Sequence, residues 1–416
     1  MSTPEPFADP RALTRSQVTA WRNALFVIFG VVGVGMASWV ARTPTIRDSL
    51  QASTWQMGLV VFGLSCGAIL GLLAASTVIE KFGTKAIMVF GLSAGGLGLA
   101  GAGVGAALGS FPLVVAALAV YGIGNSTCDV AMNVSGAANE RALGRTVMPL
   151  YHAAFSMGTV VGAGIGALAE FLQVPVAVHL PLAGLVTAVV GVWCVRYARE
   201  PIVDAVEDAA DTTTEPVVKR SWFARWADTR TLLIGLIVLG MAFAEGSAND
   251  WLALSLVDGY GTSNTVGAVG IGLFVAAMTV GRVAGVRLLD KYGRVPVLRV
   301  SAVFAVVGLS IVIFSPSIVL AAFGVVLWGL GAALGFPVGM SAAADDPARA
   351  AERVSAVATI GYLAFLVGPP LIGFLGEHFG LLNGLLAVLV LIVIAGLVSG
   401  AAREPARTTT VASGKS

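Results

Sequence analysis

Four polar residues recur at every fourth position of an otherwise apolar stretch: Tyr121, Asn125, Asp129 and Asn133. Residues four apart lie on one face of an α-helix, so this spacing predicts a polar stripe that faces a cavity or other helices. Amides both donate and accept hydrogen bonds, which suits a solute rich in hydroxyl groups, and the carboxyl group of Asp129 could carry a proton. The alternative is that the stripe joins neighbouring helices by hydrogen bonds.

A second polar group lies in the other half of the chain. Glu245 and Asn249 are one helical turn apart near the middle of an apolar stretch, and Asp250 follows directly. Glu245 is a second candidate for carrying a proton or binding the solute, whereas Asp250 could bind the solute or be a charge at the rim. Arg282 could neutralise an anionic solute or Asp129, or it could form a structural ion pair or reach the membrane interface.

Three aromatic or imidazole side chains complete the candidates. Trp39 and Trp251 could stack a sugar ring or lie at the membrane interface, and His152 could relay a proton or be a packed histidine. The predicted lining of the substrate cavity is Tyr121, Asn125, Asn133, Asn249, Asp250, Arg282, Trp39, Trp251 and His152.

The composition predicts the elements that carry these residues. Apolar types make up 57% of the 416 residues and charged types 12%, about half the charged share of a soluble domain. Since about 20 apolar residues cross a bilayer as a helix, we expect an all-α integral membrane protein with twelve transmembrane helices. The predicted spans are near 21–41, 56–79, 86–108, 112–136, 147–169, 175–197, 231–256, 265–288, 297–316, 317–341, 354–375 and 380–400.

Other classes of protein find no support in the sequence. It has no cysteine pattern for zinc, no metal or Ser/His/Asp constellation and no phosphate-binding loop. We therefore expect no enzyme activity, no cofactor, no metal and no nucleic-acid partner.

The positions of the basic residues predict the orientation. With the N-terminus in the cytosol, 22 of the 25 Lys and Arg lie in cytosolic segments, Arg42 and Arg47 lie outside, and Arg282 lies within a span. Cytosolic loops carry an excess of Lys and Arg, so both termini are predicted to be cytosolic in a multi-pass protein of the cell (inner) membrane. The predicted domains are a cytosolic segment 1–20, a six-helix half 21–197, a cytosolic linker 198–230, a second half 231–400 and a cytosolic tail 401–416.

Short segments recur between the two halves. Residues 80–85 (EKFGTK) and 290–295 (DKYGRV) follow the second and eighth spans and lie 210 positions apart. The further pairs, each 207 positions apart, are 121–124 with 328–331 and 166–170 with 373–377. Because each half has six spans, the halves have the same orientation, which makes this a parallel repeat.

The two acid-Lys-aromatic-Gly loops resemble the signature of the major facilitator superfamily of secondary transporters. Ser76 and Val286 replace the leading glycine of that signature, and Glu80 replaces its aspartate. The resemblance implies an inner gate in which these loops latch helix ends; ordinary charged anchors are the alternative. The gate-loop residues are Glu80, Lys81, Gly83, Lys85, Asp290, Lys291, Gly293 and Arg294.

The fourth span also resembles one branch of the superfamily. The spacing of Gly122, Gly124, Asp129 and Asn133 is similar to the fucose-permease-like branch, which includes bacterial sugar:proton symporters. The segments 244–246, 249–251 and 281–282 look like those of uncharacterised bacterial relatives of that branch.

The resemblance implies a secondary active transporter that works by alternating access about a site at the midplane. We expect proton-coupled symport of a sugar or similar small polar solute by a functional monomer surrounded by membrane lipid, with Asp129 and Glu245 as proton-coupling candidates. A proton-antiport exporter of drugs or metabolites is the alternative within the class. A membrane-embedded enzyme or a receptor is the alternative outside it.

Overall fold

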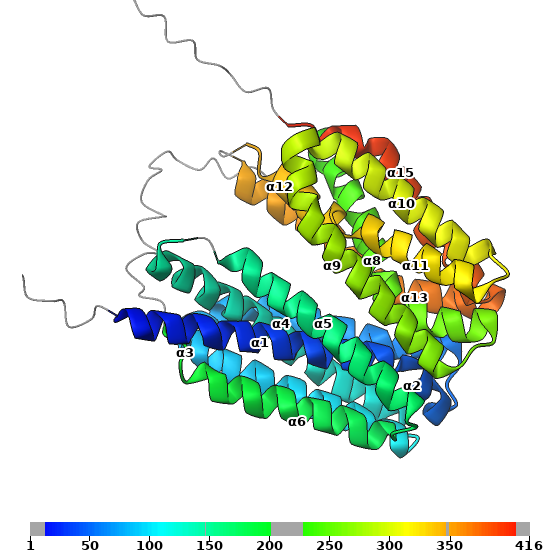
Figure 1. The fold of residues 1–416 in the computed structure, drawn as a ribbon, viewed down its shortest axis with the longest axis horizontal. Helices are drawn as coiled ribbons and strands as arrows, with labels where there is room; N and C mark the ends of the chain where they lie inside the picture. Colours follow the sequence, from blue (N-terminus) through cyan, green and yellow to red (C-terminus); the bar gives the residue numbers. More distant parts are fainter. Residues whose placement is uncertain (1–12, 146, 201–227, 347–348, 405–416) are drawn as a thin grey trace, which may run out of the picture. The chain divides into compact units, whose positions relative to one another are not determined.

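The computed structural model describes residues 13–145, 147–200, 228–346 and 349–404, and all regular secondary structure in these ranges is helical. Figure 1 shows the helices in sequence colours. Most of the predicted N-terminal segment, linker and C-terminal tail lies outside the described residues.

Eleven helical stretches within the described ranges are long and apolar enough to cross a membrane, with residues 318–343 and 381–402 each counted as one stretch. One of them, α3 (Thr54–Ala107), has 54 residues and leaves helical geometry at Gly83, where φ is 81° and ψ is 162°. A straight helix of that length would extend about 80 Å, well over twice the thickness of the hydrocarbon core. Counting α3 as two spans gives the twelve that hydropathy predicts.

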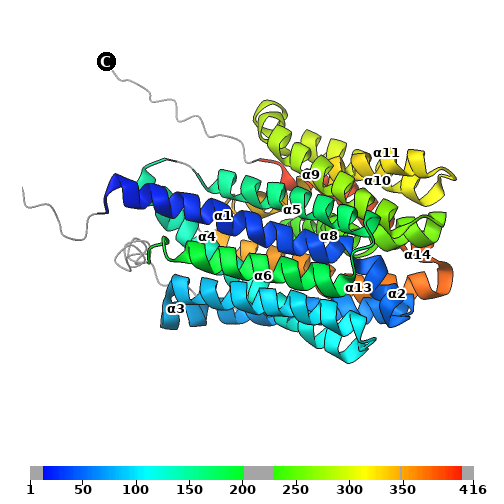
Figure 2. The same cartoon turned by 60° about the horizontal axis from the view of Figure 1, so that its bottom comes forward.

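The described chain forms two compact units. The first contains most of α3 and five further helices. These are α1 (Arg15–Ala41), α2 (Thr43–Leu50), α4 (Phe111–Leu143), α5 (Met148–Phe171) and α6 (Val176–Val195). Figure 2 shows α1 lying between α5 and α6. Glycines bring α1 and α5 together, because a Cβ at Gly158 would lie 2.1 Å from the carbonyl oxygen of Gly30.

The second unit is built around α8. Its elements are α8 (Thr229–Tyr260), α9 (Asn264–Tyr292), α10 (Arg294–Phe314), α11 (Ile318–Ala332), α12 (Gly335–Ala343), α13 (Ala350–Phe379), α14 (Leu381–Gly384), α15 (Leu386–Val398) and the 3-10 helix η2 (Ser399–Ala402). α8 packs against α13, α15 and α9 and is the most buried span of this unit. Residues 53–62, which include the start of α3, also belong to this unit, although the sequence places them in the half 21–197.

Candidate functional site

The polar residues of α4 do not face a single direction. Successive residues of an α-helix are about 100° apart, so each step of four turns the side chain by about a further 40°. Tyr121 is therefore buried, Asn125 and Asn133 are half-buried, and Asp129 is exposed. The stripe winds from the interior of the first unit to its surface.

The Asp129 carboxylate has a partner on its own helix. Asn133 Nδ2 donates to the Asp129 carbonyl oxygen at 2.8 Å and to its carboxylate Oδ1 at 3.2 Å. No ion pair to Asp129 occurs among the described residues. An accessible carboxylate without a cation, in an otherwise apolar span, is the arrangement expected along an ion or proton path.

The buried end of the stripe lines a hollow inside the first unit. The hollow is lined by Val32, Gly35, Gly91, Leu92, Gly95, Tyr121, Asn125, Cys128 and Thr187. The Tyr121 hydroxyl is buried and has no hydrogen-bond partner in the described part of the chain. The space holds about one water molecule, so it is too small for a sugar.

An interhelical ion pair is the central polar feature of the second unit. Arg282 on α9 donates from Nη2 to Glu245 Oε1 on α8 at 2.9 Å, and from Nε to the Ala333 carbonyl oxygen at 3.5 Å. The side chains of Glu245 and Arg282 remain 21% and 35% exposed. The structure thus joins two candidates that the sequence identified separately.

The other candidates of α8 follow this pair. Asn249 and Asp250 are half-buried, and neither has a hydrogen bond or ion pair to another described residue. The side chain of Trp251 is fully buried against Gly373 of α13. Asn249 lies one helical turn from Glu245, whereas Asp250 is turned by about 140° from it. Both retain free polar atoms, whereas the Trp251 ring has no open face.

The remaining two candidates lie in the first unit. Trp39 is only 3% exposed, so its ring has little open surface in this structure. His152 is exposed on α5, and its ring meets Phe29 edge-on with centroids 5.5 Å apart. Ring stacking by Trp39 and proton transfer by His152 stay predictions.

The first gate loop turns at Gly83, whose positive φ suits glycine. Glu200, which follows α6, accepts hydrogen bonds from the backbone N–H of Thr84 at 2.9 Å, the Thr84 hydroxyl at 2.8 Å and the backbone N–H of Lys85 at 2.9 Å. Glu80 and Lys81 are exposed. The loop is thus held through its backbone rather than through its own charged side chains.

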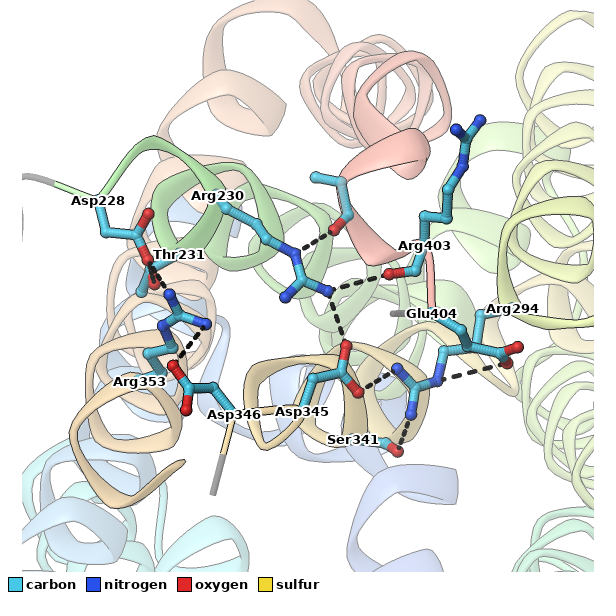
Figure 3. A network of polar contacts seen from close by, with 11 residues as sticks. Asp228, Arg230, Thr231, Arg294, Ser341, Asp345, Asp346, Arg353, Arg403 and Glu404 are labelled. Atoms are coloured by element: carbon cyan, nitrogen blue, oxygen red, sulfur yellow. Dashed lines mark hydrogen bonds and ion pairs between the residues drawn. The ribbon is translucent and has the colours of Figure 1, made fainter. Parts of the chain in front are cut away.

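The second gate loop belongs to a network at the end of its unit (Figure 3). Arg294 Nη1 meets Asp345 Oδ1 at 2.6 Å, and Arg230 Nη2 meets Asp345 Oδ2 at 2.7 Å. Arg294 also donates to Ser341 at 3.0 Å. Asp290 and Lys291 are exposed. A buried carboxylate shared by two arginines therefore joins the second gate loop to the end of α12.

Sequence reasoning missed three carboxylates that the structure places in polar clusters. Besides Glu200 and Asp345, Glu170 of α5 forms a buried ion pair with Arg42, with Arg42 Nε 2.9 Å from Glu170 Oε1. Burial lowers the pKa of the Arg42 guanidinium, and the nearby Glu170 opposes that effect. The available signal for Glu170 was its place at the end of a repeated segment. Among the described residues no group of three or more His, Cys, Asp or Glu could hold a metal ion.

Comparisons with known proteins agree with the twelve-span arrangement. The family model described as Major Facilitator Superfamily matches residues 24–285 and 246–415. The "Uncharacterized transporter y4wD" of Sinorhizobium fredii is 30% identical over 372 residues, which is 87% of this chain and 93% of that protein.

Solved structures share the fold at low sequence identity. The nucleoside transporter NupG is 14–15% identical to this chain, with TM-scores of 0.70–0.71. The aligned regions cover 92–93% of this chain and 98% of the NupG chain. The E. coli fucose:proton symporter FucP is 15% identical, with a TM-score of 0.58. The aligned region covers 94% of this chain and 100% of the FucP chain.

Proposed function

We propose a solute class and a coupling mechanism for this chain, which belongs to the Major Facilitator Superfamily and is a multi-pass membrane transporter rather than an enzyme. The protein moves a small polar solute, a sugar or similar metabolite, together with protons by alternating access. Two structural neighbours, a nucleoside transporter and a fucose:proton symporter, support a polar, hydroxyl-rich solute. The excess of Lys and Arg in the predicted cytosolic segments supports a cell-membrane protein with cytosolic termini.

The single observation that carries the proposal is the Asp129 carboxylate. It is exposed on an apolar span, and its side chain is hydrogen-bonded to Asn133 of the same helix. Such a group exchanges protons without dismantling contacts between helices. A charged carboxylate in a bilayer span is costly, which argues that it is kept for transport rather than for packing.

The second unit supplies groups that suit the solute. Asn249 and Asp250 offer unpaired amide and carboxyl atoms, and Glu245 and Arg282 are partly accessible. Amide and carboxyl groups are the usual partners of sugar hydroxyls, because they supply donors and acceptors close together. We assign these residues to solute binding and Glu245 to a second coupling role.

The first experiment identifies the solute. Purified full-length protein is heated with L-fucose, uridine, citrate or ethidium, and a shift in unfolding temperature reports binding. Stabilisation by L-fucose or uridine agrees with the proposal. Stabilisation by ethidium alone, with efflux from vesicles driven by an inward proton gradient, would instead support the proton-antiport exporter.

The second experiment tests coupling with the stabilising solute in proteoliposomes. Asp129→Asn should reduce uptake driven by a pH gradient to the level of protein-free vesicles, because an amide cannot carry the proton. Counterflow exchange at equal pH should persist, since it needs no net proton movement. Glu377→Gln is the matched control, because it neutralises an exposed carboxylate outside the predicted cavity and should retain driven uptake. Unchanged driven uptake in Asp129→Asn would refute the assignment.

A further inference from the structure

A four-residue sequence occurs after the last span of each half. Ala-Arg-Glu-Pro spans residues 198–201 and again residues 402–405, 204 positions apart. The first copy follows α6, and the second begins at the last residue of η2. Ala198 and Ala402 are both 0% exposed. The two copies therefore occupy matching places at the ends of their six-helix halves, and the glutamates Glu200 and Glu404 are equivalent.

In the first copy, the glutamate caps a helix. After Gly83, α3 resumes helical geometry at Thr84, and the first N–H groups of a helix have no carbonyl partner of their own. Glu200 accepts from two of these groups, on Thr84 and Lys85, and also from the Thr84 hydroxyl. A carboxylate is favoured at this position because it meets the positive end of the helix dipole.

In the second copy, the glutamate faces the matching position. The carboxylate of Glu404 lies 3.8 Å from Arg294 Nε, and Arg294 is the residue directly after Gly293. A Cβ at Gly293 would lie 3.7 Å from the nearest Glu404 oxygen. In both halves the glutamate thus meets the first residue after the positive-φ glycine of the gate loop.

We propose that Glu200 and Glu404 are positioning residues that fasten each gate loop to the last span of its own half. The gating role of these loops rests on the proposed function, whereas their attachment to the last span does not. The two copies differ in strength. Glu200 makes three hydrogen bonds, but Glu404 is 55% exposed and its contact is long, while Arg294 is already held by Asp345. The first loop depends on its glutamate and the second has a stronger anchor.

Hydrogen–deuterium exchange of the solute-free, full-length protein tests this directly. Glu200→Gln should speed exchange of the Thr84 and Lys85 amides by about tenfold or more, because the hydrogen bonds lose a charged acceptor. Exchange at the start of α5 should stay unchanged. In the matched variant Glu404→Gln, exchange at the start of α10 should rise by less than about threefold. Unchanged protection of Thr84 and Lys85 in Glu200→Gln would overturn the inference, whatever the transport assays show.

A second pair of variants keeps both glutamates and so covers a failure of Glu200→Gln to fold. A Cβ at Gly83 would lie 2.9 Å from Glu200 Oε1, whereas the one at Gly293 would keep 3.7 Å from Glu404. Both glycines have similar positive φ, so the backbone strain is matched. Gly83→Ala should therefore speed exchange after its loop several-fold more than Gly293→Ala does. Equal acceleration would contradict a special role for Glu200.

Discussion

Two ion pairs of equal length lie in very different surroundings. Arg42 and Glu170 approach to 2.9 Å with side chains 2% and 5% exposed. Arg282 and Glu245 also approach to 2.9 Å, but their side chains are 35% and 21% exposed. Distance alone therefore does not separate the pair enclosed by helices from the pair that we assign to solute binding and coupling, whereas burial does.

The additional partners strengthen the contrast. Arg42 donates to the Val174 carbonyl oxygen at 2.7 Å, and the Thr45 hydroxyl donates to Glu170. Beyond Glu245, Arg282 has one long contact to a backbone carbonyl. The first pair is fixed by its surroundings on both sides. The second is held by fewer contacts, which is the arrangement that we expect of a pair proposed to release its partner during transport.

The largest expected effect comes from breaking the buried pair. Glu170→Gln leaves the Arg42 charge buried without its counterion, so the free energy of unfolding should fall by about 3–5 kcal/mol. Unfolding of the purified protein by denaturant measures this. The matched control is Glu377→Gln at the equivalent place in the repeat, where the side chain is exposed and accepts from the Trp55 backbone N–H. Equal losses in the two variants would show that burial does not separate these sites.

The same contrast explains what the sequence could predict. The spans follow from local hydropathy and the repeat from short motifs, so the helices and their order could be predicted. Glu245, Arg282 and Asp129 could also be selected as candidates from the sequence, because a charge within an apolar run stands out, and their roles stay predictions. The pairing of Arg42 with Glu170 was not, since both lie at span ends where charges are common and 128 positions separate them. The burial of Tyr121 and the exposure of Asp129 could not be predicted either. A spacing of four suggests a single face, although each step turns the side chain by about 40°.

A smaller effect on stability is expected at the accessible pair. Glu245→Gln should change the free energy of unfolding by less than about 1 kcal/mol, because both side chains are partly exposed. The same variant should change the pH dependence of solute uptake in proteoliposomes. A stability loss as large as that of Glu170→Gln would place this pair with the buried one and remove the distinction.

An effect of similar size is expected at a third pair of similar length, at the end of the second unit. Arg353 Nη2 lies 3.0 Å from Asp228 Oδ2, with side chains 13% and 22% exposed. The hydrogen bond from Thr231 and the charge of Arg353 hold the pKa of the Asp228 carboxyl below its ordinary value. The stabilisation is therefore present above the unfolded pKa, about 4, and is lost as the pH falls through the lower folded value.

Asp228→Asn removes this titration. At pH 7 the variant should be less stable by up to about 1 kcal/mol, and the gap should close as the pH is lowered below about 4. Unfolding temperatures at a series of pH values measure the gap, with Asp290→Asn, at an exposed residue, as the control. A gap that stays constant on acidification would mean that Asp228 acts through packing, and burial rather than charge would then rank all three pairs.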